Sequence, residues 1–190
     1  LDFSRWRIWF RETARRVIEW TPDAGVAIFF QSDIRHENQW IDKGHLVLQA
    51  SEDTGAFVVF HKIVCRYAPG AIAQGRAVYS HLICVSKLAR PLPTRPGPDV
   101  LADAGYKPAV KSMGVNACRL ACRFLLDETS TTSVVDPFCG YGTVLAVANT
   151  MGLDAVGVDL SRRCCQAARK LELTVDQINP RKERNPGLQP

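Results

Sequence analysis

The chain has 190 residues, of which 46% are hydrophobic and 23% charged, enough for one globular domain with a sizeable core. Its formal net charge of +5 fits a nucleic-acid partner without requiring one. No apolar run approaches the roughly 20 residues that span a bilayer, and the N-terminus lacks a signal-peptide pattern. Composition therefore argues against a membrane protein or a secreted one.

Cysteine usage supports a reducing compartment. The chain has seven cysteines, an odd number, and most lie inside apolar runs. This pattern predicts reduced, buried thiols in an intracellular, cytoplasmic protein. There is no CxxC pair, and the adjacent Cys164 and Cys165 cannot easily face one ion. We therefore predict no metal site.

The first predicted element is a helix over Asp2–Trp20. Its apolar residues recur at helical spacing, and Asp2 is a suitable N-cap. A basic face lies beside the apolar stripe, formed by Arg5, Arg7, Arg11, Arg15 and Arg16. This face is either solvated or in contact with phosphates.

A short apolar run over Val26–Phe30 predicts a strand buried on both sides of a parallel sheet. Polar residues just past the carboxyl end of such a strand stand where ligands bind in open α/β sheets. Asp33 and Arg35 are therefore candidates for the substrate side, with a plain polar loop as the alternative. A helix is expected over Trp40–Ala50, with His45 turned inward.

Two longer apolar runs, Ala56–Cys65 and Ala77–Ser86, predict an antiparallel hairpin at a sheet edge. His61 and Lys62 interrupt the first run. The connecting loop is rich in Gly, Pro and Ala, and such loops often contact substrate. The side chains it offers are Arg66, Tyr67, Gln74 and Arg76.

Four of the eleven prolines fall within Leu88–Lys107, which is predicted to be a connector. An amphipathic helix follows over Gly114–Asp127, and Ser161 is expected to cap a helix that runs to Leu171. We expect one domain over residues 1–178 and a flexible tail over residues 179–190.

The most informative stretch, Val134–Leu160, reads strand, glycine turn, helix, strand, acid. Its first apolar run is closed by Asp136, and Asp159 closes the second, 17 residues after Gly142. Glycine lets the turn approach a ligand closely, and a helix that starts there points unpaired N–H groups at the same place. Half of a nucleotide-binding sheet is predicted. The alternative is a ligand-free α/β core with incidental glycines.

The turn itself, DPFCGYGT from Asp136 to Thr143, resembles the first motif of class I S-adenosylmethionine-dependent methyltransferases. The DPFxGxGT form is characteristic of enzymes that methylate exocyclic amino groups of DNA bases, and some RNA relatives share it. The cofactor half comes late in this chain, which resembles the permuted (beta-class) DNA amino-methyltransferases. The resemblance implies an α/β, Rossmann-like three-layer sandwich: a mostly parallel sheet with an antiparallel edge hairpin and a circularly permuted motif order.

The same resemblance implies S-adenosyl-L-methionine as the cofactor. Asp159 would hold the ribose hydroxyls, and Leu160 would border the adenine. The complete set of implied cofactor-binding residues is Asp136, Phe138, Cys139, Gly140, Gly142, Thr143, Asp159 and Leu160.

Two departures from the family limit this reading. The catalytic tetrapeptide, Asp/Asn/Ser-Pro-Pro-aromatic, is absent because the chain has no Pro-Pro dipeptide. In the permuted order it would lie upstream of Leu1, so we expect a domain that lacks its N-terminal catalytic strand. Asp33 and Arg35 are then the catalytic candidates that this chain offers. No insertion is long enough for a target-recognition domain either.

The predicted function is methylation of an amino nitrogen of a nucleic-acid base, in DNA or RNA. One alternative is a cofactor-binding but catalytically inactive partner subunit of a methyltransferase complex. Others are a small-molecule or protein methyltransferase and a basic RNA-binding module without a cofactor. The oligomeric state is left open.

Overall fold

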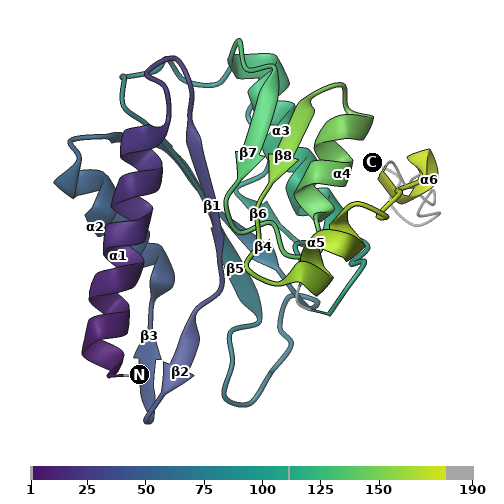
Figure 1. Cartoon of the computed structure of the whole chain (residues 1–190). Helices are drawn as coiled ribbons and strands as arrows, with labels where there is room; N and C mark the ends of the chain where they lie inside the picture. The colour runs from purple at the N-terminus through teal and green to yellow at the C-terminus, as the bar shows by residue number, and fades with distance from the viewer. Residues whose placement is uncertain (1, 111, 179–190) are drawn as a thin grey trace, which may run out of the picture. The chain divides into compact units, whose positions relative to one another are not determined.

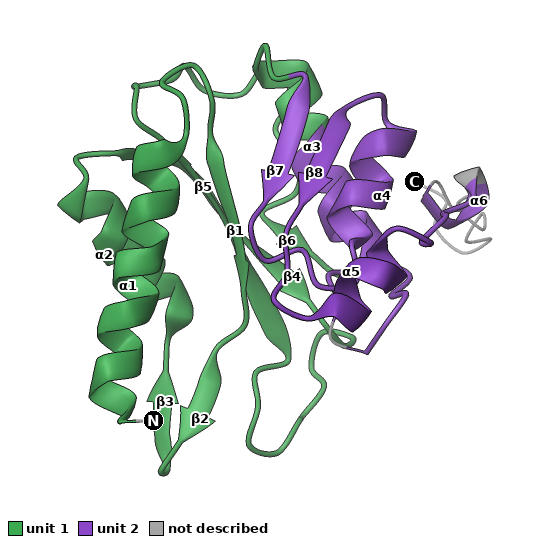
Figure 2. Ribbon diagram, in the orientation of Figure 1, with its two compact units in different colours: residues 1–104, 123–131 green, residues 105–122, 132–190 purple. Residues whose placement is uncertain are grey.

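The computed structural model describes residues 2–110 and 112–178, which fall into two compact units (Figure 2). Unit 1 comprises residues 1–104 and 123–131, and unit 2 comprises residues 105–122 and 132–190. The tail predicted over residues 179–190 lies outside the described residues. The prediction of one domain over residues 1–178 stays a prediction.

Unit 1 contains a four-stranded sheet with the order β1-β5-β4-β6 (Figure 1). Strand β5 runs antiparallel to both of its neighbours, and β6 runs parallel to β4, so β1, β4 and β6 share one direction. A separate two-stranded hairpin joins β2 to β3. The elements are α1 (Phe3–Trp20), β1 (Ala27–Gln31), β2 (Ile34–His36), β3 (Gln39–Ile41), α2 (Lys43–Asp53), β4 (Phe57–Cys65), β5 (Tyr79–Ser86) and β6 (Val100–Leu101).

The predicted antiparallel hairpin is confirmed as β4 and β5. Its position differs from the expectation, because β5 also pairs with β1 and therefore lies inside the sheet. Strand β4 is bordered on its other side by β6, which has two residues. That short strand falls in the proline-rich segment that we predicted to be a connector. The local sequence of this segment does not predict that it pairs with β4.

The core of unit 1 forms where α1 and α2 pack on one face of the sheet. Ile18 of α1, Val47 of α2 and Ile83 of β5 are among its fully buried side chains. Because side chains alternate along a strand, Cys84 and its cross-strand partner Phe60 point to the other face. There the ring of Phe60 meets Phe124 of α3 (Val115–Glu128), with ring centroids 5.0 Å apart. The second face of the sheet is thus contacted by the part of α3 that belongs to unit 1.

Helix α2 begins later than predicted. Residues Gln39–Ile41 form β3, and the helix starts at Lys43 because Asp42 caps it, accepting a hydrogen bond from the His45 N–H at 2.8 Å. This cap shifts the inward face by one position, so His45 is exposed and its predicted core role is wrong. The buried residues of α2 are Gly44, Leu46, Val47, Ala50 and Ser51.

Unit 2 contains a parallel pair of strands, β7 and β8, followed and separated by helices. Its elements are the first part of α3, β7 (Ser133–Asp136), α4 (Thr143–Thr150), β8 (Asp154–Gly157), α5 (Arg162–Ala168) and α6 (Val175–Ile178). The predicted strand, glycine turn, helix and strand are all confirmed. Ser161 caps α5 as predicted, accepting from the Cys164 N–H at 3.3 Å, although the helix ends at Ala168 and not at Leu171.

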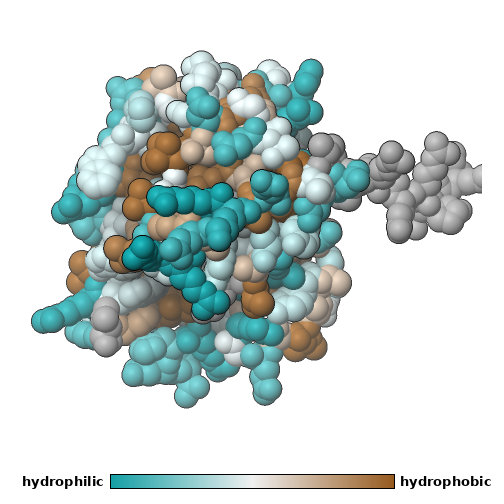
Figure 3. Space-filling model, turned by 45° about the vertical axis from the view of Figure 1, so that its right-hand side comes forward, coloured by the Kyte–Doolittle hydropathy of each residue, from teal (hydrophilic) through white to brown (hydrophobic). Residues whose placement is uncertain are grey.

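One side of the β7–β8 pair is open. Val135 of β7 and Val156 of β8 are 69% and 58% exposed, and Val158, which follows β8, is 57% exposed. Elsewhere too the molecule has hydrophobic residues open to solvent among hydrophilic ones, as Figure 3 shows for one face. Among the described residues β7 pairs with β8 alone and β1 with β5 alone. The additional strand that the resemblance implies stays a prediction.

The described helices include none that is both long enough and apolar enough to cross a membrane. All seven cysteines are free thiols. Burial raises the pKa of Cys84 and of Cys122 to about 12, as expected for packed thiols.

We predict that Ile83→Ala destabilises unit 1 by about 2–5 kcal/mol, because truncation of this fully buried side chain leaves a cavity in the core between the sheet and the helices α1 and α2. Ile72→Ala is the matched control, since Ile72 is 97% exposed in the loop and its truncation should change stability by less than about 0.5 kcal/mol. Urea unfolding followed by circular dichroism measures both. Equal effects of the two substitutions would contradict this description of the core.

Candidate functional site

The carboxyl ends of β7 and β8 are tied to the glycine turn by three hydrogen bonds. The Val158 N–H donates to the Asp136 carbonyl at 2.9 Å, and the Cys139 N–H donates to the Val158 carbonyl at 2.9 Å. The Gly140 N–H donates to Oδ2 of Asp159 at 3.0 Å. The turn after one strand is thus held by the acid that follows the other, which places the two predicted acids at one site.

The two glycines of the turn are required for different reasons. Both have positive φ, 51° at Gly140 and 76° at Gly142. A Cβ on Gly142 would lie 2.6 Å from Cβ of Ala168, so this glycine allows the turn to pack on α5. A Cβ on Gly140 would meet nothing within 4 Å. Gly140 therefore borders open space that a ligand can fill.

The start of α4 faces the same turn. Its N-cap is Gly142, which has no side chain to satisfy the first backbone N–H groups. Thr143 is 3% exposed, and its Oγ1 is a buried side-chain oxygen without a hydrogen-bond partner among the described residues. Buried polar atoms in folded proteins normally have a partner. A polar ligand at the turn would supply one.

The ionised form of the Asp136 carboxyl is disfavoured in the folded protein. Burial raises the pKa of its carboxyl, and the nearby Asp159 raises it further, against the Phe138 N–H, which donates to Oδ1 at 2.9 Å. Asp159 also accepts from the Ser161 N–H at 2.7 Å. Two carboxylates this close favour a ligand that brings positive charge or hydroxyl donors.

All eight predicted cofactor-binding residues lie in this turn or at the adjacent strand ends of unit 2. Phe138 is 59% exposed and Leu160 fully so, which leaves both apolar side chains open to a ligand. Cys139 is less open to a ligand, because its side chain is buried beside Gly157 and its N–H already donates to the Val158 carbonyl. Burial raises the pKa of the Cys139 thiol. The assignment of these residues to a cofactor stays a prediction.

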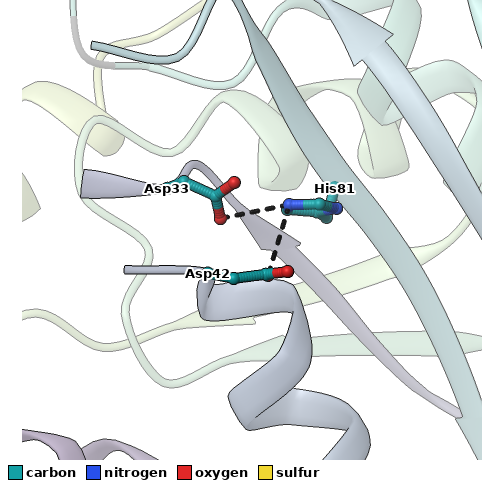
Figure 4. A group of neighbouring side chains, drawn as sticks. All are labelled: Asp33, Asp42 and His81. Carbon is teal, nitrogen blue, oxygen red and sulfur yellow. Dashed lines mark hydrogen bonds and ion pairs between the residues drawn. The ribbon is translucent and has the colours of Figure 1, made fainter. Parts of the chain in front are cut away.

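The predicted substrate-side residue Asp33 is 5% exposed and lies in unit 1 between the end of β1 and the start of the β2–β3 hairpin (Figure 4). Burial by itself would raise the pKa of Asp33, but hydrogen bonds to the carboxylate outweigh it and leave the pKa below its ordinary value. Arg35 is exposed on β2. The donors to Asp33 are Trp40 Nε1 at 3.3 Å, the Lys43 N–H at 2.9 Å, Tyr79 Oη at 3.2 Å and His81 Nε2 at 3.1 Å.

Asp33, Asp42 and His81 have side-chain atoms within 4.8 Å of one another, a spacing compatible with a metal ion. The hydrogen bonds favour another use of these groups. Both Asp33 oxygens already accept two donors each, and a His81 Nε2 that donates to a carboxylate carries a proton where a metal needs a lone pair. The prediction of no metal remains a prediction.

Sequence reasoning missed that His61 and His81 form one cluster with Asp33. Nε2 of His61 lies 2.9 Å from Nδ1 of His81. The register pairs His81 with Ile63 and His61 with Ile83, so the histidines are diagonal neighbours on one face of the hairpin. Both histidines interrupt apolar strands, which was a sequence signal for a functional role. The pairing register of β4 and β5 brings them together, and the sequence of the connecting loop does not predict this register.

Comparison with solved structures finds 32 matching chains, and those named below are DNA methyltransferases that share the α/β fold of this chain. One match is a candidate DNA modification methylase from Thermus thermophilus complexed with S-adenosyl-L-methionine, at 18% identity and TM-score 0.65 over 88% of this chain and 76% of that one. Another is the PvuII DNA methyltransferase (cytosine-N4-specific), at 14% identity and TM-score 0.69 over 93% and 74% of the two chains.

A third match is M1.HpyAVI in complex with SAM, at 14% identity and TM-score 0.60 over 84% of this chain and 80% of that one. At these identities the likeness is one of fold. No protein-family model matches the chain, and no curated protein matches it by sequence. The predicted Rossmann-like α/β class is therefore confirmed by structure and not by sequence relatives.

We predict that Asp136→Asn stabilises the protein at pH 7. The folded-state pKa of Asp136 lies above its ordinary value of 3.8, so the native state loses stability as pH rises from 3.8 through the raised pKa. An amide removes this loss and can still accept from the Phe138 N–H. Thermal unfolding at pH 3.5 and pH 7 measures the effect. The stabilisation should be large at pH 7 and small at pH 3.5, and a pH-independent difference would contradict it.

Proposed function

We propose that the chain is a methyltransferase domain that binds S-adenosyl-L-methionine through unit 2 and methylates an amino nitrogen of a nucleic-acid base. The observation that carries the proposal is the glycine turn between β7 and α4. It combines open space at Gly140, two acids at the strand ends and a Thr143 Oγ1 that has no hydrogen-bond partner within the described part of the chain. The fold shared with DNA methyltransferases makes DNA the first substrate to test.

The residues at the turn suit the cofactor, whose sulfonium carries the methyl group to be transferred. Asp136 and Asp159 place negative charge where the ligand has cationic sulfonium and ammonium groups, and Asp159 keeps oxygen lone pairs for ribose hydroxyls. Thr143 and the first turn of α4 offer hydrogen bonds to the polar end of the ligand. Phe138 and Leu160 offer apolar surface to the adenine. Alignment of donor and acceptor atoms is the main contribution that such a transfer needs from the protein.

Nucleic acid as the partner is supported by exposed aromatic and basic side chains in unit 1. Trp40 is 49% exposed and Tyr67 is 41% exposed, and the Arg76 guanidinium lies 5.6 Å from the Tyr67 ring centroid. Aromatic rings interleaved with arginines suit unpaired bases, and a base must leave the stack before its amino group can react. These side chains come from the β2–β3 hairpin and the β4–β5 loop.

The basic face of α1 is a weaker candidate for phosphate contacts. Arg15 forms ion pairs with Glu12 and with Glu19, and Arg11 pairs with Asp53. These arginines are largely neutralised by neighbours, which supports the solvated interpretation of the face.

A cofactor-binding subunit without catalytic activity is the second candidate function. It is favoured by one sequence observation, the lack of any Pro-Pro dipeptide and hence of the family's catalytic tetrapeptide. The two candidates agree on cofactor binding and differ in methyl transfer.

We predict that Gly140→Ala weakens binding of S-adenosyl-L-methionine at least tenfold, because the new Cβ enters ligand space. Gly152→Ala is the matched control: Gly152 also has positive φ, 86°, and a Cβ added there would meet nothing within 4 Å, but it ends α4 away from the turn. Both substitutions should cost about 1 kcal/mol of stability through backbone strain. Titration calorimetry measures the affinities.

Equal affinities in the two variants would place the cofactor elsewhere. Transfer of a labelled methyl group to DNA, tRNA, rRNA and protein then separates the candidate functions. Label in DNA or RNA supports the enzyme, label in protein alone overturns the nucleic-acid assignment, and binding without transfer favours the inactive subunit.

We also predict that Arg35→Ala lowers the slope of log affinity for DNA against log salt concentration by about 1, because Arg35 is exposed on β2. Arg15→Ala should leave the slope unchanged, since its charge is balanced by Glu12 and Glu19. Fluorescence anisotropy with a labelled oligonucleotide at several salt concentrations gives both slopes. A larger effect from Arg15 would instead assign α1 to the phosphates.

A further inference from the structure

Unit 1 contains a continuous line of hydrogen bonds from a buried carboxylate to an exposed imidazole, and Figure 4 shows its inner part, the contact between Asp33 and His81. Oδ1 of Asp33 lies 3.1 Å from Nε2 of His81, and Nδ1 of His81 lies 2.9 Å from Nε2 of His61. Asp33 and His81 are 5% and 6% exposed, whereas His61 is an exposed residue. The line thus connects the interior of the unit to solvent.

The direction of each hydrogen bond in this line is fixed by Asp33. Three groups donate to its oxygens, Trp40 Nε1, the Lys43 N–H and Tyr79 Oη, so the carboxylate is an anion with acceptor atoms only. Nε2 of His81 must therefore carry a proton, which leaves the lone pair of a neutral His81 on Nδ1. That lone pair accepts from Nε2–H of His61, and the remaining lone pair of His61 is on Nδ1.

The packing holds the His81 ring in this orientation. A Cβ on Gly44 would lie 2.9 Å from Cγ of His81, so the backbone of α2 rests directly on the ring. The Tyr79 ring contacts the same imidazole edge-on, with centroids 5.4 Å apart. A ring clamped between a helix backbone and an aromatic side chain cannot flip without local rearrangement.

The charged and titratable groups around the two histidines come from three elements. Asp33 follows β1, Tyr79 belongs to β5, and Asp42 at the start of α2 places Oδ1 3.7 Å from Nε2 of His81. Lys43 faces the cluster from α2, where its Nζ donates to Gln31 Oε1 at 3.0 Å, and burial lowers its pKa.

The pKa of His61 is lowered by burial and by His81, although Asp42 and Asp33 oppose this. The outer imidazole is therefore neutral at pH 7. Its Nδ1 lone pair is then available to accept a proton or a hydrogen bond.

Trp40 is bound to the same carboxylate as His81 and is half-exposed. Its indole N–H is bound to Oδ2 of Asp33, so the ring is anchored to the same carboxylate that orders the histidines, yet the residue is 49% exposed. An anchored, half-exposed indole is a stacking surface for a flat ring, and exposed Arg35 on the same hairpin adds positive charge. These features suit a nucleobase better than an aliphatic ligand.

We propose that Asp33, His81 and His61 form a proton relay whose outer atom, Nδ1 of His61, accepts an N–H donor of an unpaired nucleobase. The choice of a nucleobase as ligand rests on the proposed function, whereas the relay itself does not. When Nδ1 of His61 takes a full proton, the proton on its Nε2 passes to Nδ1 of His81. The resulting His81 imidazolium lies between the carboxylates of Asp33 and Asp42, which stabilise its charge.

The relay is tested in the full chain by ¹⁵N NMR of the imidazoles, because the four histidines give separable signals and His36 and His45 serve as internal references. We expect Nε2–H tautomers for both His61 and His81. Asp33→Asn should abolish the preference at His81 and alter His61, since an amide can donate as well as accept. Tyr79→Phe is the matched control: it removes one donor to Asp33 and should leave both tautomers unchanged.

Nδ1–H at His61 in the wild-type chain would overturn the relay, as would unchanged tautomers in Asp33→Asn. If Asp33→Asn fails to fold, His81→Gln replaces it, and His61 should then lose its tautomer preference.

Ligand binding is tested with short single-stranded oligo(dC), whose bases carry amino groups, and with an abasic strand of equal length. We expect the His61 Nδ1 signal to move with oligo(dC) only, and His61→Gln to weaken its binding about fivefold to tenfold, the loss of one hydrogen bond. His45→Gln should bind normally, because His45 lies on the exposed side of α2. A signal that moves equally with the abasic strand would overturn the nucleobase assignment.

Failure of the proposed function gives a different pattern. A chain without affinity for S-adenosyl-L-methionine or methyl transfer would still show the two tautomers. Conversely, normal methyl transfer together with the opposite tautomers would contradict the relay and leave the proposed function in place.

Discussion

The buried carboxylate of Asp33 organises unit 1. Its four donors belong to three elements beyond β1: Trp40 to β3, the Lys43 N–H to the start of α2, and both Tyr79 and His81 to β5. An unpaired carboxylate in this position would be strongly unfavourable, and so would donors left without it. The hairpin, the helix and the central strand are thus held in one arrangement by a group that is stable only when all of them are in place.

In unit 2 a carboxylate at the strand ends also accepts hydrogen bonds that hold neighbouring segments together, but fewer of the polar groups at this site are paired. Asp159 accepts from the Gly140 and Ser161 N–H groups and so fixes the turn that opens α4. In contrast to Asp33, this site keeps open space beside Gly140 and a buried hydroxyl of Thr143 without a partner among the described residues. The acceptor atoms of Asp33 are thus fully used within the protein, whereas the site at Asp159 leaves open space and one polar atom without a partner among the described residues.

Much of this structure could be predicted from local sequence, and the parts that could not be predicted have a physical explanation. The β7–turn–α4–β8 unit was predictable because its strands, glycines and acids follow each other within 27 residues, from Val134 to Leu160. Helix α1 was predictable from its apolar stripe and the Asp2 cap.

The hairpin Ile34–Ile41 was missed because its turn uses Glu37 and Asn38 at positive φ, 46° and 62°, and lacks the usual glycine. The cluster around His81 was missed for another reason. It depends on cross-strand register and on the closeness of Gly44 to the ring, and both are properties of tertiary packing. Asp33 was found because it follows a buried strand, although its partners were not.

The two acids that follow strands differ in a way that bears on function. Hydrogen bonds hold the pKa of Asp33 below its ordinary value, so this carboxylate contributes to stability as an anion. Burial and Asp159 hold the pKa of Asp136 above it, so this carboxylate costs stability as an anion. A structural role alone gives no reason to keep Asp136 ionisable, since an amide would make the same bond to the Phe138 N–H. The proposed cationic cofactor would give one, because its binding would restore the stability that the free protein lacks.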